Sequence, residues 1–153
     1  MNIELGGGTQ PTRLREPSRS DYINLDIIDH PNVDFRCDLR KGIPYQDESV
    51  DNIYSCEFIE HLEIPDLDRL LKECYRVLVQ NGTLYLTCPN FEGLVEMFQQ
   101  RKHLYYVRRS VLGDGSTPYD YHRSILWPEL LIGKLREIGF SEVYDISKER
   151  LEE

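Results

Sequence analysis

Short apolar runs alternate along the chain with longer stretches in which apolar residues recur at helical spacing. The short runs predict strands at residues 2–5, 22–28, 33–39, 50–56, 83–88 and 140–146. Helical spacing begins at Pro65 and continues through Leu67, Leu70, Leu71, Cys74 and Leu78. This helix is expected to end at Asn81-Gly82, and further helices are predicted at residues 91–101 and 128–138. Such an alternation is typical of an α/β domain with a mostly parallel sheet, which binds ligands at the carboxyl ends of its strands.

Two segments do not follow this alternation. Residues 10–21 contain Pro11 and Pro17, and prolines at that density do not suit a long regular helix. Residues 103–123 combine aromatic side chains and arginines with Gly113-Asp114-Gly115. They predict a long irregular segment, and such segments in compact domains are often functional lids.

Length and composition narrow the class of protein. The 153 residues predict one domain, 1–153, and neither a membrane-spanning run nor a signal peptide is visible, so a cytoplasmic location is expected. The four cysteines form no C-x-x-C pair, and no paired histidines accompany them, so no metal is expected and zinc is disfavoured. A net charge of -9, from 27 acidic and 18 basic residues, disfavours nucleic acid as the main partner.

Three consecutive glycines, Gly6, Gly7 and Gly8, directly follow the first predicted strand. Glycines in this position let the backbone turn sharply and approach a ligand. The second predicted strand carries Asp26, and an acidic residue at this distance can accept hydrogen bonds from ribose hydroxyls. The pattern therefore predicts a site for an adenosine-containing ligand. It is not a full dinucleotide fingerprint, because Pro11 stands where the third glycine is needed, and no G-K-[ST] follows for a P-loop.

Several further motifs occur in a fixed order along the chain. They are Glu4-x-Gly6-x-Gly8, then Ile43-Pro44-Tyr45 with Asp47, Ser49, Asp51 and Ile53, then Glu60-His61-Leu62, and finally residues 73–84. Together they cover about residues 3–90 and resemble the class I S-adenosylmethionine-dependent methyltransferases. Within this family the chain looks like a small member of the type 11 group.

This resemblance implies a Rossmann-like, doubly wound, mostly parallel sheet that is trimmed at both ends, with no obvious seventh strand. It also implies S-adenosyl-L-methionine as the cofactor. By position, the implied cofactor-binding residues are Glu4, Gly6, Gly7, Gly8, Asp26, Asp38, Cys56 and Glu57. Glu4 would support the turn, Asp26 would hold the ribose and Asp38 would face the adenine, although a capping role explains an aspartate such as Asp38 equally well. A full helix usually follows the glycine turn in this family. In its absence Arg13 or Arg15 could pair with the carboxylate of the cofactor, and the favoured alternative is that both are solvated loop charges.

Methyl transfer needs a base only when the acceptor must lose a proton. Charged side chains near the predicted transfer site are Glu57, Glu60, His61, Asp120 and His122. Of these, His61, Asp120 and His122 are the catalytic candidates, since a histidine titrates near neutral pH and residues 119–123 are placed to meet an acceptor. A structural role for His61 and simple loop packing for residues 119–123 are the alternatives.

Two other functions stay open from the sequence. One is a degenerate domain that binds S-adenosylmethionine, S-adenosylhomocysteine or a protein without turnover, and the other, disfavoured by Pro11, is an NAD- or nucleotide-sugar-binding oxidoreductase. The acceptor, a small molecule or otherwise, is not identified.

Because the chain begins at its first strand and ends after its sixth, a bare sheet edge and hence a homodimer are expected. Tyr105, Tyr106 and Trp127 would supply aromatic side chains to that interface.

Overall fold

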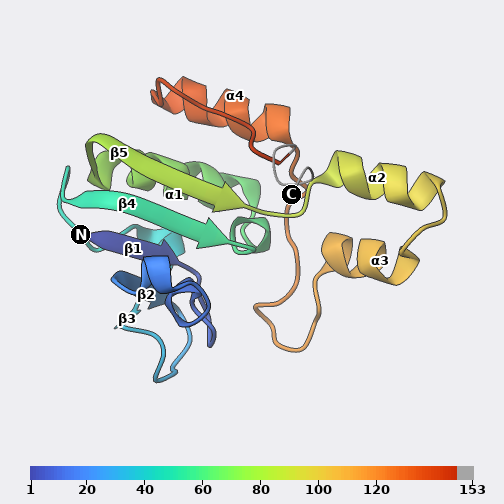
Figure 1. The fold of residues 1–153 in the computed structure, drawn as a ribbon, viewed down its shortest axis with the longest axis horizontal. Helices are drawn as coiled ribbons and strands as arrows, with labels where there is room; N and C mark the ends of the chain where they lie inside the picture. The colour runs from blue at the N-terminus through green and yellow to red at the C-terminus, as the bar shows by residue number, and fades with distance from the viewer. Residues whose placement is uncertain (148–153) are drawn as a thin grey trace.

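The computed structural model describes residues 1–147, which form a five-stranded, entirely parallel sheet with helices packed beside it (Figure 1). The strand order is β3-β2-β1-β4-β5. The strands are β1 (Asn2–Leu5), β2 (Tyr22–Asp26), β3 (Phe35–Arg36), β4 (Val50–Cys56) and β5 (Leu78–Thr87). The α-helices are α1 (Ile64–Val77), α2 (Phe91–Gln99), α3 (Leu104–Leu112) and α4 (Pro128–Ile138). The expected α/β, Rossmann-like fold class is thereby confirmed.

One face of the sheet is apolar because side chains alternate along each strand. Ile3 lies beside Ile23 on β2 and Ile53 on β4, and Ile53 lies beside Leu84 on β5. Helix α1 covers this face with the buried side chains Leu67, Leu70, Leu71, Cys74 and Val77. Helix α4 packs beside α1, where the Lys134 ammonium lies 2.5 Å from the Asp68 carboxylate. The hydrophobic core therefore lies between the sheet and these two helices.

The opposite face of the sheet is polar and aromatic. No long helix of residues 1–147 lies over it: residues 10–21 form two 3₁₀ turns, η1 (Thr12–Leu14) and η2 (Pro17–Arg19), in agreement with the effect expected of Pro11 and Pro17. The Arg19 guanidinium lies over the Tyr54 ring, 3.9 Å from its centroid, with Tyr22 and Tyr85 beside it. This cation–π cluster covers the middle of that face.

Three predicted boundaries near the sheet are wrong. Helix α1 ends at Val77 and β5 begins at Leu78, so Asn81-Gly82 lies inside a strand rather than ending a helix. Asn81 has a φ of 63°, and the β4–β5 register shifts between Val50 and Asn52. The left-handed residue therefore lies at an irregularity in the strand pairing and not at the end of a helix. Strand β2 ends at Asp26 instead of residue 28, and β3 keeps only two of the residues predicted at 33–39.

The segment after β5 also differs from its prediction. Residues 103–123, expected to be irregular throughout, contain α3, which forms an arm with α2 beside the carboxyl ends of the strands (Figure 1). His103 adopts a left-handed backbone conformation at the start of α3, where the chain turns back. Residues 140–146 form no strand in the described chain. Phe140 instead packs edge-on against Tyr75, with ring centroids 5.1 Å apart, and most residues after it are exposed.

Strand β5 is an edge of the sheet, since its only strand neighbour among residues 1–147 is β4. A second copy of the chain on this edge stays a prediction. A search of the same residues finds no helix that is long and apolar enough to cross a membrane.

A charge network joins α1 to the loop before β4 and gives a test of the packing. Arg76 donates to both carboxylate oxygens of Glu73, at 2.8 and 2.7 Å, and these bonds chiefly lower the pKa of Glu73. Because the folded pKa lies below the ordinary value, the stabilisation is complete above that ordinary value and is lost as the pH falls through the folded pKa. We expect Glu73→Gln to cost about 1–2 kcal/mol at neutral pH and progressively less in acid.

Urea unfolding of the wild type and Glu73→Gln across a pH series measures this difference. Glu137→Gln, an exposed position on α4, is the matched control and should change the free energy of unfolding by less than about 0.5 kcal/mol. A pH-independent difference for Glu73→Gln would contradict the prediction.

Candidate functional site

The glycine turn follows β1 at the carboxyl edge of the sheet. Gly6 and Gly8 have φ values of +68° and +57°, a region that residues with a side chain rarely adopt. The Gly6 amide donates to the Leu25 carbonyl at 2.9 Å, so the turn begins while still bonded to β2. A methyl group at position 6 would lie 2.1 Å from Cγ of Phe58, so the Phe58 ring packs directly on the turn.

Polar residues of β2 hold the rest of the turn. The Asn24 side-chain oxygen accepts from the Gly7 amide at 3.1 Å, and one Asp26 oxygen accepts from the Gly8 amide at 2.9 Å. The other Asp26 oxygen accepts from the Ile28 amide at 3.1 Å. A carboxylate offers about four acceptor positions, so Asp26 keeps capacity for hydroxyl groups of a ligand. The structure thus brings Gly6, Gly7, Gly8 and Asp26 together as the sequence predicted.

Glu4 lies beneath the turn rather than in it. Its carboxylate is buried and accepts from the Thr12 amide, at 3.0 and 2.8 Å, and from the Thr12 hydroxyl at 2.8 Å. Burial raises the pKa of Glu4, while the bonds from Thr12 act in the opposite direction. Glu4 therefore fastens the chain after the turn to the polar face of the sheet.

Asp38 follows β3 and is engaged within its own turn. It caps the 3₁₀ turn η3 (Leu39–Lys41) by accepting from the Arg40 amide at 3.1 Å, and the Arg40 guanidinium donates to both its oxygens at 2.8 and 2.9 Å. These bonds from Arg40 chiefly lower the pKa of Asp38. The capping role is present in the structure, and a contact of Asp38 with adenine stays a prediction.

Cys56 and Glu57 stand at the carboxyl end of β4. Cys56 is half-buried, and Glu57 is exposed with a φ of 52°, an uncommon value for a residue with a side chain. The Glu57 amide donates to the Thr87 carbonyl at 2.9 Å, so this bend is held against the end of β5. Strained residues of this kind often occur at functional sites.

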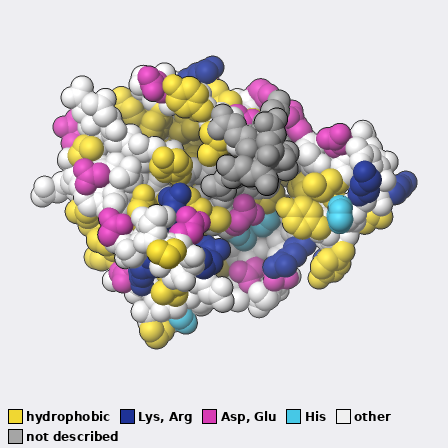
Figure 2. Space-filling view, in the orientation of Figure 1, with side chains coloured by type: hydrophobic (Ala, Val, Ile, Leu, Met, Phe, Trp, Pro, Cys, Tyr) yellow, Lys and Arg dark blue, Asp and Glu magenta, His cyan; other side chains and the backbone are white. Residues whose placement is uncertain are grey.

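Two of the three catalytic candidates meet beside this bend. His61 belongs to the 3₁₀ turn η4 (Ile59–His61), and His122 lies between α3 and α4; their rings meet edge to face, with centroids 4.8 Å apart. Burial and then His122 lower the pKa of His61. Glu60, the residue before His61, lies beside both rings, and burial raises its pKa to about 8. Figure 2 shows histidine and acidic side chains gathered between the sheet and the α2–α3 arm.

The third candidate, Asp120, is bonded elsewhere. Its carboxylate accepts from the Ser116 hydroxyl at 2.5 Å, and this bond chiefly lowers the pKa of Asp120. Asp120 therefore braces its own loop. Its charge acts to raise the pKa of His61, but Asp120 is not among the three side chains that converge, Glu60, His61 and His122.

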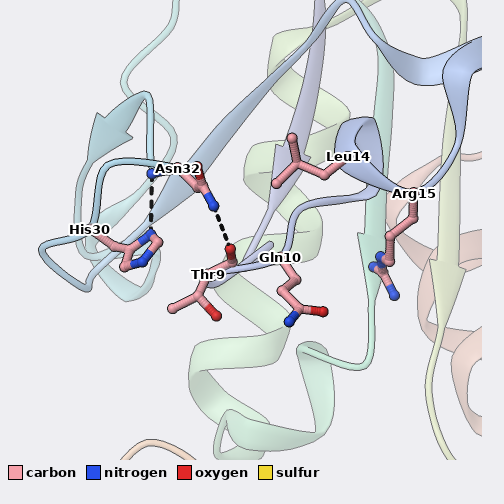
Figure 3. Close-up of a pocket in the computed structure, with 6 residues that line it drawn as sticks. All are labelled: Thr9, Gln10, Leu14, Arg15, His30 and Asn32. Atoms are coloured by element: carbon pink, nitrogen blue, oxygen red, sulfur yellow. Dashed lines mark hydrogen bonds between the residues drawn. The ribbon is translucent and has the colours of Figure 1, made fainter.

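An open pocket lies beside the glycine turn, with a volume of about 540 Å³ (Figure 3). Its lining residues are Thr9, Gln10, Leu14, Arg15, His30 and Asn32. Asn32 closes one side by donating to the Thr9 carbonyl at 2.7 Å. Of the two arginines considered for a ligand carboxylate, Arg15 lines this pocket, whereas Arg13 is bonded to Asp34 and to the Tyr22 and Asn32 carbonyls. His30 and Asn32 carry no local motif, and sequence reasoning missed them.

The structure is an α/β domain with a glycine turn at the carboxyl ends of its strands, the edge at which parallel α/β sheets bind ligands. A family model described as a methyltransferase domain matches residues 6–86, more than half of the chain, and the chain belongs to this family. The search of curated proteins gives no significant match.

Solved structures share the fold at low sequence identity. A SAM-dependent methyltransferase from Methanosarcina mazei has a TM-score of 0.66 at 17% identity, with 94% of this chain and 80% of that chain covered. One from Archaeoglobus fulgidus has a TM-score of 0.60 at 18% identity, covering 94% and 62%. A Haloferax volcanii protein, solved with the Trm112 methyltransferase activator, has a TM-score of 0.57 at 17% identity, covering 90% and 59%. The chain thus spans about three fifths of the length of these last two relatives.

Proposed function

We propose that this domain binds S-adenosyl-L-methionine and transfers its methyl group to an acceptor. The observation that carries the proposal is the glycine turn bonded to Asp26 in a chain of the methyltransferase-domain family. Asp26 would accept from the ribose hydroxyls, and Asp38 would reach the adenine from the end of β3. In the same arrangement Arg15, in the adjoining pocket, supplies a positive charge for the cofactor carboxylate.

Methyl transfer from a sulfonium is an in-line displacement in which the carbon–sulfur bond breaks as the bond to the acceptor forms. The cofactor supplies the reactive group, so the protein mainly aligns the acceptor and excludes water. Cys56 and Glu57 border the proposed transfer position, and His61 and His122 lie on its acceptor side. We include in the proposal that one of these histidines removes a proton when the acceptor must lose one. The acceptor atom itself is not specified.

A non-catalytic binding domain is the second candidate. It is favoured by η1 and η2, which replace the usual helix after the glycine turn and leave an open pocket there. A protein partner would complete such a site, and the Haloferax volcanii protein is one fold neighbour that was solved in complex with another protein. An NAD-dependent oxidoreductase has no comparable support, since the matched family is that of methyltransferases.

We expect S-adenosylhomocysteine to raise the melting temperature, because a ligand that binds only the folded state stabilises it by mass action. At about 100 times its Kd the gain is near 2.7 kcal/mol, or roughly 5–10 °C for a domain of this size. Differential scanning fluorimetry with S-adenosylhomocysteine, S-adenosylmethionine and NAD measures the shift. NAD should give none. The absence of a shift with millimolar S-adenosylhomocysteine would refute cofactor binding, and binding without turnover on any acceptor would favour the second candidate.

A further inference from the structure

Three potential metal ligands converge beside the end of β4. They are the Glu60 carboxylate and the His61 imidazole from η4, and the His122 imidazole from the segment between α3 and α4. One ligand atom from each side chain lies within 4.8 Å of the other two. This cluster combines one carboxylate with two imidazoles, all of which are ligands of divalent transition metals.

Among residues 1–147, the Glu60 carboxylate has no hydrogen-bond partner. The residue is 2% exposed, and neither of its oxygens is bonded to a group in this part of the chain. His122 faces this carboxylate, with its Nε2 3.9 Å from Oε1 of Glu60, which is too long for a hydrogen bond. A buried carboxylate without partners is costly, so the site requires a proton, a water or a cation to complete it.

Both histidines are oriented by backbone carbonyl groups. Nδ1 of His61 lies 3.2 Å from the Tyr121 carbonyl, and Nδ1 of His122 lies 2.8 Å from the Ser110 carbonyl. Because a carbonyl only accepts, Nδ1 carries the hydrogen in each ring and Nε2 keeps a free lone pair. This orientation by a second hydrogen bond is the usual condition of a metal-binding histidine.

The backbone holds the cluster together before any ligand arrives. The Glu60 carbonyl accepts from the Arg123 amide at 2.8 Å and from the Ser124 amide at 3.1 Å, which fixes His122 beside Glu60. A small cavity of about 10 Å³ adjoins Glu60 and His122, near the lower limit for one water molecule.

We propose that Glu60, His61 and His122 bind one divalent transition-metal ion, with Zn²⁺ the best-fitting ion. Three protein ligands of this kind leave a further coordination position for water or another ligand. Ligand atoms on a tetrahedral Zn²⁺ lie about 3.3 Å apart, so the cluster must contract on binding. His61 is only half-buried, so its side chain is more accessible than that of the buried Glu60 and is the one expected to shift.

This inference departs from the sequence-based expectation of no metal, which considered cysteine pairs and neighbouring histidines. It also gives the two imidazoles a role as ligands rather than as bases. It does not depend on methyl transfer, because metal binding can be measured without cofactor or acceptor. Failure of this proposal and failure of the proposed function are therefore distinguishable.

Isothermal titration of the untagged, chelator-treated chain with Zn²⁺, and separately with Mn²⁺ and Mg²⁺, tests the proposal. We expect one Zn²⁺ per chain with a Kd in the micromolar range or below, and weaker binding of Mg²⁺, which prefers oxygen ligands. Co²⁺ should give visible absorption bands of a four- or five-coordinate ion. No Zn²⁺ binding at concentrations up to about 1 mM would overturn the proposal.

Substitutions at the three proposed ligands test where the metal ion binds. Glu60→Gln and His122→Gln should each weaken Zn²⁺ binding by at least about tenfold. His103→Gln, an exposed histidine outside the cluster, and Cys88→Ser, a thiol near Glu60, should leave it unchanged. His61→Gln provides the same test at the half-buried position if either buried variant fails to fold. Zn²⁺ affinity that survives the substitutions at all three ligands, or that is lost in Cys88→Ser, would place the ion elsewhere and overturn the assignment.

Discussion

Asp26→Ala is expected to weaken S-adenosylhomocysteine binding by about 1–3 kcal/mol, roughly 5- to 150-fold in Kd. Two effects combine in this variant. The ribose hydroxyls lose their acceptor in a partly buried site, and the Gly8 amide loses the bond that holds the turn in place. The Gly8 and Ile28 amides lie at the partly exposed edge of the sheet, so the free energy of unfolding should fall much less than the free energy of binding.

Isothermal titration of the wild type and the variant with S-adenosylhomocysteine gives the two Kd values. Asp29→Ala is the matched control: it is the same change three residues later, where the carboxylate is exposed and pairs with Arg36 at the surface. It should bind like the wild type. Equal Kd values for Asp26→Ala and Asp29→Ala would show that Asp26 does not hold the ligand, even if the domain binds it.

Gly6→Ala is expected to destabilise the fold more than Gly8→Ala, the same change two residues later in the turn. The residue must keep a left-handed backbone, which costs about 1–2 kcal/mol, and its new methyl group overlaps the Phe58 ring, which costs roughly 1–3 kcal/mol more. At Gly8 the backbone is also left-handed but nothing lies within 4 Å of a new methyl group. Gly8→Ala should therefore show only the first cost.

Chemical denaturation of both variants and of Gly93→Ala separates these contributions. Gly93 lies inside α2 with open space around it, so alanine there should stabilise the chain by about 0.5–1 kcal/mol. The double variant Gly6→Ala/Phe58→Leu should recover part of the loss. Equal destabilisation at Gly6 and Gly8 would mean that Phe58 does not pack on the turn in solution.

The parts of the site that the sequence predicted depend on neighbouring strands. Gly6 to Gly8 and Asp26 come together because the carboxyl ends of parallel strands meet at one edge, and β1 and β2 were both visible as apolar runs. The end of α4 could also be predicted from nearby residues, because Gly139 directly follows a regular apolar pattern. In the structure Gly139 has a φ of 124°, as expected of a glycine that ends a helix. In both cases the information lies in short motifs on one strand, on two consecutive strands or at the end of one helix.

The parts that were missed depend on contacts between distant residues. Glu60 and His122 are some sixty residues apart, and only the path of the chain through α3 and back brings them together. Asn81-Gly82 has the same left-handed tendency whether it ends a helix or bends a strand, so the residues alone do not distinguish the two. Residues 140–146 have apolar positions suited to a strand, but Phe140 packs against Tyr75 of α1 instead of pairing with β5.

Residues 57–61 contact both the glycine turn and the segment that carries His122. At one end Phe58 rests on Gly6, and at the other the Glu60 carbonyl holds the backbone of Arg123 and Ser124. A ligand that shifts the glycine turn must therefore also act on the segment that carries His122. Coupling between two binding sites is reciprocal in free energy. If cofactor binding changes the metal affinity of the Glu60–His61–His122 cluster by some factor, metal binding at the cluster changes the cofactor affinity by the same factor. The order in which the two ligands arrive would then change the path to the ternary complex but not its stability.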